Sequence, residues 1–103
     1  MHINIETSGE LMIVYLCGEI DHHSVKEIRE KADVALSLHK PAHLIVDFKN
    51  VTFMDSSGIG FVMGRFRMLQ NFHGTMEIRG VTEQTKRIME LAGIGRIAII
   101  KEK

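Results

Sequence analysis

Residues 43–72 read HLIVDFKNVTFMDSSGIGFVMGRFRMLQNF, and this stretch decides the fold. Its first part, His43 to Phe48, is a short apolar run rich in β-forming residues, which predicts a buried strand. A turn at Lys49-Asn50 and a short segment over 51–54 are expected next. From Asp55 to Phe72 the pattern becomes helical, with one stripe formed by Ile59, Val62, Phe66 and Leu69. The stretch therefore predicts a buried strand followed by an amphipathic helix.

On the N-terminal side, Leu11 to Leu16 predicts a second buried strand. Ile3 and Ile5 alternate with polar residues before a Ser8-Gly9 turn, which indicates an edge strand paired to it as a hairpin. We expect a helix over 22–38, with Asp21 as its N-cap and Pro41 ending it. Its buried face is predicted to hold Val25, Ile28, Ala32, Ala35 and Leu36.

On the C-terminal side, Gly74 is expected to end the second helix, and Thr75 to Val81 alternates as a strand does. Thr82 is the predicted N-cap of a third helix that Gly93 closes, and Ile97 to Ile100 is a last short strand. The inward face of this third helix is predicted to hold Ile88, Leu91 and Ala92. Strands separated by helices predict a single α/β domain over 1–103, with a mixed, mostly parallel β-sheet and helices packed on it.

Composition excludes several classes of protein. The chain has 103 residues, 45% of them apolar and 25% charged, which suits one globular domain. Cys17 is the only cysteine, so an internal disulfide and a cysteine-based metal site are excluded, and a reducing, cytoplasmic location is the default. Thirteen basic residues balance thirteen acidic ones, so no nucleic-acid partner is indicated. No apolar run reaches the roughly 18–20 residues that cross a bilayer, and we expect no membrane partner.

The junction from Asp55 to Gly64 is the most informative part of the chain. Two hydroxyl residues, Ser56 and Ser57, directly follow a carboxylate where a strand gives way to a helix. Open α/β sheets place their ligand sites at such loops, and a helix N-terminus favours a negative group. The simplest interpretation is that Asp55 or Ser56 caps the helix.

Enzymatic interpretations of this junction have weak support. A phosphate-binding loop needs a lysine that is absent after Gly64, and a nucleophile elbow needs a glycine two residues before its serine. A catalytic triad of Ser56, Asp55 and one of the two adjacent histidines, His22 or His23, stays open. It would make the chain a small serine hydrolase. The six histidines lack a metal-binding spacing, so we predict no metal and no catalytic residue.

A serine that receives a phosphate is the interpretation that remains. Phosphate on Ser56 would add about −1.5 to −2 charges near pH 7. The start of the helix would accept this charge, whereas a docked partner would have to desolvate it. Modification of this serine would therefore act as a binding switch.

The predicted second helix also carries a second apolar stripe. Phe61, Met68 and Phe72, with Gly64 between them, lie roughly 120° around the helix from the first stripe. We favour packing of this stripe against a neighbouring helix or the sheet edge. The alternative is an exposed patch for a protein partner.

Three segments together carry a family resemblance. Gly18-Glu-Ile-Asp-His-His23, Asp47 to Gly60 and Met63-Gly-Arg65 resemble the anti-sigma factor antagonists of the STAS domain family over nearly the whole chain. The resemblance implies a small α/β domain whose unmodified form binds an anti-sigma factor with serine kinase activity, which then releases a sporulation sigma factor. Members of the family continue past the last strand into a further helix, whereas these residues end at Lys103.

The resemblance also implies the roles of individual residues. The kinase, using its own ATP and magnesium, would phosphorylate Ser56, the first serine after the aspartate, and a serine phosphatase would restore the chain. The chain itself would need no cofactor and act as a monomer. The glycines of Met54-Asp-Ser-Ser-Gly58-Ile-Gly60 also leave open a nucleotide-sensing STAS module. The implied partner-binding residues are Glu19, Asp21, His22, Asp55, Ser56, Ser57, Gly58 and Gly60.

Overall fold

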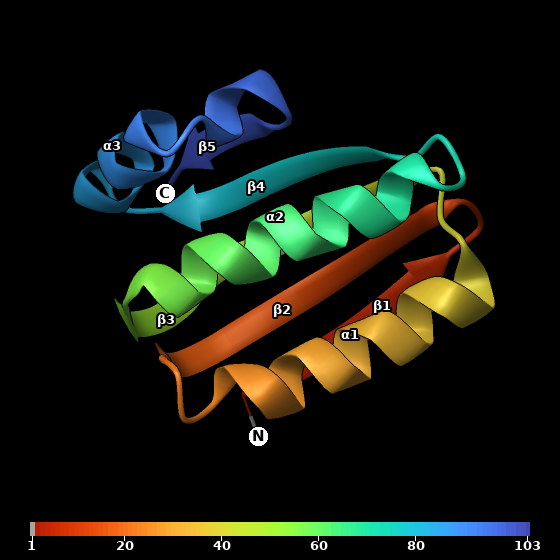
Figure 1. Ribbon diagram of the computed structural model, residues 1–103, viewed down its shortest axis with the longest axis horizontal. Coiled ribbons are helices and arrows are strands. Elements are labelled where there is room, and N and C mark those ends of the chain that lie inside the picture. Colours follow the sequence, from red (N-terminus) through yellow and green to blue (C-terminus); the bar gives the residue numbers. More distant parts are fainter. Residues whose placement is uncertain (1) are drawn as a thin grey trace.

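The computed structural model describes residues 2–103 and contains one five-stranded sheet with helices packed against it (Figure 1). The strands lie in sequence order, β1-β2-β3-β4-β5, so each strand neighbours the next along the chain. β1 pairs antiparallel with β2, and the other three pairs are parallel, which confirms the predicted mixed α/β sheet. The elements are β1 (Ile3–Ser8), β2 (Leu11–Ile20), α1 (Val25–His39), β3 (His43–Met54), α2 (Ser56–Gln70), β4 (Thr75–Val81), α3 (Glu83–Leu91), the 3-10 turn Ile94–Arg96 and β5 (Ile99–Glu102).

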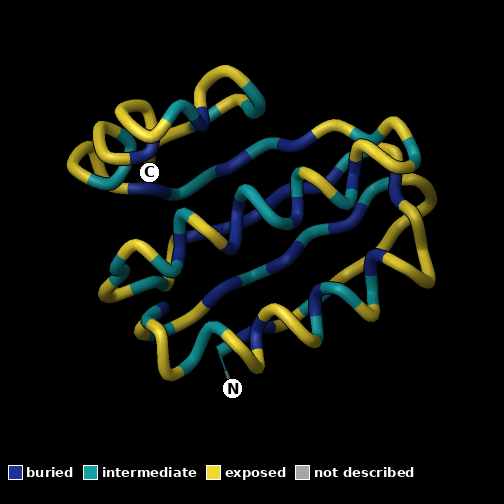
Figure 2. Tube along the Cα trace, in the orientation of Figure 1, coloured by how far each residue is buried: buried dark blue, intermediate teal, exposed yellow. Residues whose placement is uncertain are grey.

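The core lies between the sheet and the helices. Figure 1 shows α1 and α2 side by side in front of the sheet, and Figure 2 shows buried residues along the central strands and on the inner sides of these helices. β2, β3 and β4 contribute alternate residues to the core, among them Val14, Val46 and Ile78, each 1% exposed or less. This alternation is the two-residue period of a strand with one face on a core.

The opposite face of the sheet carries one polar row. Tyr15, Asp47, Arg79 and Lys101 lie in register on four adjacent strands, one residue after the core positions. Arg79 Nε donates to Asp47 Oδ2 at 2.8 Å, and this bond holds the pKa of Arg79 above its ordinary value. The charged row therefore stabilises the face of the sheet that points away from the core cluster.

The predicted turn at Lys49-Asn50 is wrong, because β3 runs on without interruption to Met54. Tyr15 pairs with Asp47 but Cys17 pairs with Asn50, so β3 has one residue more than β2 between these two pairs. This irregular pairing accommodates the turn-forming residues inside the strand. The Lys49 N–H donates to the Asp47 side chain at 2.8 Å.

Two helix predictions need correction. α1 begins at Val25 instead of residue 22, and the residue at its N-cap is Ser24 instead of Asp21. Asp21 lies one turn earlier, where it organises the loop before the helix. In α3 the inward-facing residues were predicted wrongly, since Ile88 is 46% and Leu91 84% exposed and Ala92 is also exposed. The buried residue of this helix is Met89.

The second apolar stripe of α2 packs inside the protein, as we favoured. Phe61 is 2% exposed, and Met68 and Phe72 are half-buried against the core. Arg65, on the same helix, is also buried and forms an ion pair with Asp33 of α1 at 2.8 Å. Burial lowers the pKa of Arg65, and Asp33 opposes this shift. α2 therefore packs against the sheet on one side and against α1 on another.

Candidate functional site

The strand–helix junction lies at one end of the sheet, on the left in Figure 1. There the last residues of β2 and β3 lie next to each other, with Ile20 paired to Met54. The Asp55 N–H donates to the Ile20 carbonyl at 3.2 Å, which ties the start of α2 to the end of β2. Two loops far apart in sequence thus form a single surface.

Asp55 caps α2. It has extended backbone angles, and its Oδ1 accepts the Ser57 N–H at 2.8 Å, as an N-cap side chain does. This hydrogen bond holds the pKa of Asp55 below its ordinary value, because the charged carboxylate is the better acceptor. Ser56 is the first residue of the helix and is exposed, whereas Ser57 is half-buried. The capping interpretation is confirmed for Asp55, and Ser56 is left on the surface.

Asp21 organises the facing loop between β2 and α1. Its Oδ1 accepts the N–H groups of His23 at 2.9 Å and Ser24 at 3.0 Å. These backbone hydrogen bonds, above all that from Ser24, lower the pKa of Asp21. The Ser24 hydroxyl in turn donates to the Glu19 carbonyl at 2.8 Å. The loop is therefore pinned at both ends, and the Glu19 side chain is exposed.

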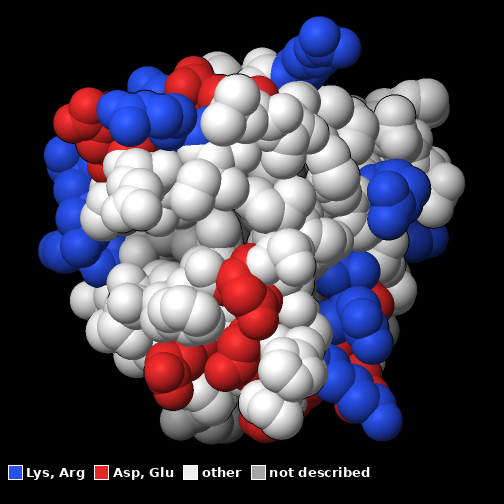
Figure 3. All heavy atoms as spheres, turned by 60° about the vertical axis from the view of Figure 1, so that its left-hand side comes forward, with Lys and Arg blue, Asp and Glu red and all other residues white. Residues whose placement is uncertain are grey.

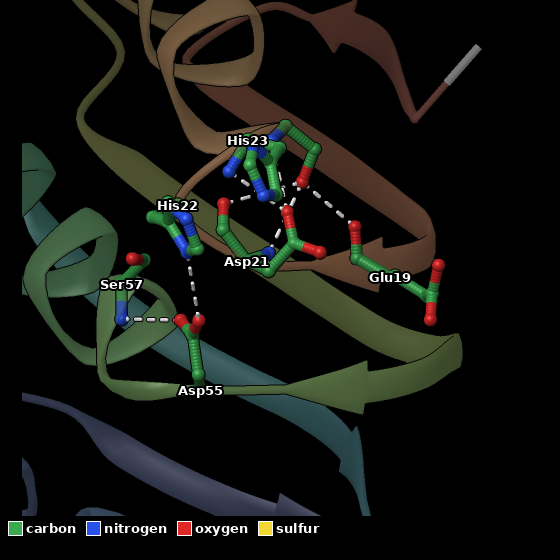
Figure 4. A network of polar contacts seen from close by, with 7 residues as sticks. Glu19, Asp21, His22, His23, Asp55 and Ser57 are labelled. Atoms are coloured by element: carbon green, nitrogen blue, oxygen red, sulfur yellow. Dashed lines mark hydrogen bonds and ion pairs between the residues drawn. The ribbon is translucent and has the colours of Figure 1, made fainter.

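His22 connects the two loops. Its Nδ1 lies 3.8 Å from Asp55 Oδ2, and its side chain is 73% exposed. Figure 4 shows His22 pointing from the β2–α1 loop toward Asp55, while Glu19 points the other way. The His22 and His23 rings are 3.9 Å apart between centroids. An ionised carboxylate thus has an imidazole on one side and a helix N-terminus on the other.

Most of the predicted partner-binding residues lie on this surface, which we call the switch face: Asp21, His22, Asp55, Ser56 and Ser57, with Glu19 at its edge and its side chain pointing away from Asp55. The two glycines of the motif differ. Gly58 is buried, and a Cβ there would overlap the Met54 side chain, so its role is steric. Gly60 is exposed on α2, where a Cβ would meet no other atom within 4 Å.

The switch face is acidic. Figure 3, which brings this end forward, shows Asp and Glu side chains gathered in the lower middle of the face, with Lys and Arg toward its edges. Glu19, Asp21 and Asp55 supply three carboxylates. Such a field favours a partner with basic residues.

A groove adjoins the switch face and was missed from sequence. It has a volume of about 330 Å³ and lies between the end of β3 and the start of α3. Its walls include Phe53 and Met54, directly before Asp55, and Ile88 of α3. The sequence signal was the apolar pair at 53–54, which we interpreted only as a connecting segment. The lining residues are Phe48, Val51, Thr52, Phe53, Met54, Val81, Thr82, Gln84, Thr85 and Ile88.

The geometry gives little support to catalysis by a serine. The contact between His22 and Asp55 is 3.8 Å, longer than a hydrogen bond, and Asp55 uses its other oxygen on the Ser57 backbone. Among residues 2–103, no group of three or more His, Cys, Asp or Glu is placed to hold a metal ion. The same residues include no helix that is both long and apolar enough to span a membrane.

Comparison with known proteins points to one family. The model of the STAS domain matches residues 2–103. An anti-sigma F factor antagonist of Paenibacillus polymyxa is 32% identical over 97 residues, which cover 94% of this chain and 83% of that protein. The unphosphorylated anti-sigma factor antagonist SpoIIAA superposes with a TM-score of 0.82 at 30% identity, covering 95% of this chain and 86% of the other. SpoIIAA of Bacillus in its phosphorylated form gives a TM-score of 0.76 at 30% identity, with 95% and 89% covered.

Proposed function

The chain belongs to the STAS domain family, and from this premise we propose that it is an anti-sigma factor antagonist. In its unmodified form it binds an anti-sigma factor with serine kinase activity, which then releases a sporulation sigma factor. That kinase phosphorylates Ser56 and so ends the binding, and a serine phosphatase restores the active form. The names of the Paenibacillus relative and of SpoIIAA, a protein with a phosphorylated form, support this proposal.

The observation that carries the proposal is the position of Ser56. It is the exposed first residue of α2, directly after the Asp55 cap and within the acidic switch face. A kinase can reach this hydroxyl without opening the fold. A partner that docks on the face must also cover it.

The switch follows from the cost of moving charge out of water. A phosphate adds about −1.5 to −2 charges at a helix N-terminus, which favours a negative group, while Asp55 next to it opposes the addition. The two effects offset each other, so the fold is retained. A docked partner, by contrast, would have to desolvate the phosphate next to carboxylates that already face its basic residues. Phosphorylation therefore weakens binding more than it weakens folding.

The remaining parts of the proposal follow from this role. Glu19 and Asp21 face basic residues of the kinase, which supplies its own ATP and magnesium, so the chain needs no cofactor. We assign it no enzymatic activity. A regulator of transcription acts where RNA polymerase is, so the proposal includes a cytoplasmic location, and it takes the chain to act as a monomer.

The site of modification is tested by mass spectrometry after incubation with the purified kinase, ATP and magnesium. We expect the wild type to gain one phosphate, Ser56→Ala to gain none, and the control Ser57→Ala to gain one. Phosphate on Ser57 instead of Ser56 would contradict the assignment.

The effect of modification is tested by calorimetric titration of the kinase with each form. Unmodified chain and Ser56→Ala should bind, whereas phosphorylated chain and Ser56→Asp should bind at least about tenfold more weakly. Thermal unfolding should show that the Tm of Ser56→Asp stays within a few degrees of the wild type. Equal affinity of the two phosphoforms would refute the mechanism.

A further inference from the structure

The groove between β3 and α3 is lined by six apolar residues and four uncharged polar ones. Phe48, Val51, Phe53, Met54, Val81 and Ile88 form the walls, and three threonines and Gln84 complete the lining. None of the ten lining residues is charged. Its volume of about 330 Å³ lies at the lower end of the roughly 300–1,000 Å³ typical of ligand pockets.

Two of the wall residues are more exposed than their chemistry favours. The exposed fraction is 53% for Phe53 and 46% for Ile88. Exposed large apolar side chains that line a concave surface mark binding sites more often than isolated ones do. The groove therefore has apolar area available to a partner.

The groove is continuous with the switch face. Met54, one of its walls, precedes Asp55 directly and packs against Gly58 in the first turn of α2. Met54 and Ser56 are two residues apart, so their Cα atoms are at most about 7 Å from each other. A specific interface covers about 800 Å² on each partner, a disc of roughly 16 Å radius. An interface of this size centred on Ser56 therefore reaches as far as Met54, one of the residues that line the groove.

We propose that this groove receives an apolar side chain of the same kinase that docks on the switch face, so that the acidic face orients the partner and the groove anchors it. The inference rests on the proposed function. Interfaces commonly combine a buried apolar anchor with a charged rim, which is the arrangement that the groove and the three carboxylates provide.

The chemistry of the lining favours a protein side chain over a nucleotide. A nucleotide needs cations or converging N–H groups for its phosphates, and the lining holds no lysine or arginine. Asp55, which directly follows the lining residue Met54, would repel a phosphate. Nucleotide binding in the groove is thus the competing outcome of the test.

The test compares two substitutions on α3. Ile88→Asp places a charge in the groove, and the matched control Leu91→Asp places the same charge on the same helix outside the lining, where Leu91 is 84% exposed. Calorimetric titration with the purified kinase should show binding weakened about tenfold or more for Ile88→Asp and within about twofold for Leu91→Asp. Circular dichroism and thermal unfolding check that both variants fold.

A second groove variant and NMR titrations complete the design. Phe53→Ser should also weaken kinase binding, and the Thr52 and Thr85 amide signals should shift in NMR spectra when the kinase is added. Equal affinity of the Ile88→Asp and Leu91→Asp variants for the kinase would overturn the inference, whether that affinity is unchanged or reduced. Shifts of the same amides with ATP or GTP alone would overturn it in favour of a nucleotide.

The failure of the groove and the failure of the proposed function are distinguishable. If Ser56→Asp weakens binding while Ile88→Asp and Phe53→Ser do not, the switch stands and the groove is not an anchor. If Ser56→Asp binds like the wild type, the proposed switch itself fails. Absence of any binding between the unmodified chain and the kinase would overturn both.

Discussion

α2 and α3 start alike and end differently. Both follow a parallel strand, and both are capped by a side-chain oxygen: Asp55 accepts the Ser57 N–H at 2.8 Å, and Thr82 accepts the Thr85 N–H at 3.1 Å. α2 buries five residues against the sheet and α1, whereas α3 buries only Met89. In Figure 2 the α3 region is largely exposed.

The difference shows that a cap determines where a helix begins and its neighbours determine which side is buried. α2 lies next to α1 in front of the central strands, with contacts on two sides. α3 lies beside β4 and the four-residue strand β5. The first arrangement packs the helix that begins at Ser56 against neighbours on two sides. The second leaves apolar side chains on the surface, some of them facing the groove.

The contrast between α2 and α3 should be largest when one apolar side chain of each helix is truncated to alanine. Phe61→Ala in α2 removes a side chain that is 2% exposed and should lower the free energy of unfolding by about 3–5 kcal/mol in urea denaturation. Ile88→Ala in α3 should lower it by about 1 kcal/mol or less, because the side chain is half exposed. Similar losses for the two variants would remove the distinction between the helices.

The two glycines of the switch motif offer a matched pair. Gly58→Ala places a methyl group against Met54 and should destabilise the fold by about 1–3 kcal/mol. Gly60→Ala enters open space on a helix and should stabilise it by up to about 1 kcal/mol. Adding Met54→Ala should recover part of the Gly58→Ala loss in denaturant unfolding, and a double mutant with purely additive losses would argue against the contact.

The N-cap side chains of α2 and α3, Asp55 and Thr82, should both stabilise their helices through a hydrogen bond. Thr82→Ala should lower the free energy of unfolding by about 1 kcal/mol. Asp55→Ala should lower the Tm as well, whereas Asp55→Asn, which keeps an acceptor oxygen, should lower it less. Thermal unfolding measures all three. A loss for Asp55→Asn as large as for Asp55→Ala would show that charge matters more than the hydrogen bond.

The smallest effect is that of pH. The pKa values of Asp55 and Asp21 lie below the ordinary 3.8, because backbone N–H groups bind the charged forms. Their folded-state pKa is thus lower than the unfolded one, so their stabilisation is complete above about pH 4 and is lost as the pH falls through the folded pKa. Carboxyl ¹³C NMR titration should place both midpoints below 3.8, and midpoints at or above that value would contradict the hydrogen-bond assignment.

Much of the fold could be predicted because its signals are local. The apolar run from His43 to Phe48 indicated a buried strand and the carboxylate of Asp55 indicated a cap, and both are present. The α3 face was predicted wrongly because apolar spacing says which residues share a side but not whether anything covers that side. The Lys49-Asn50 error has a similar origin, since turn-forming residues also suit a bulge between paired strands.

The candidate site could likewise be predicted only in part. The motif located the start of α2 and the loop with Asp21, but their meeting depends on contacts between distant residues, such as the Asp55 N–H on the Ile20 carbonyl. The burial of Arg65 could not be foreseen, because Asp33, its partner, comes from another helix 32 residues earlier. The groove was missed for the same reason, since its walls come from β3, β4 and α3.

The hydrogen bond from the Ser57 amide to Asp55 has a consequence for the proposed modification of Ser56. Because the carboxylate already accepts this N–H, a phosphate on Ser56 would experience the field of the helix start without using this backbone donor. In the proposed switch, the cap and the phosphate thus use different groups of the same helix start, so adding or removing the phosphate requires no change in the cap.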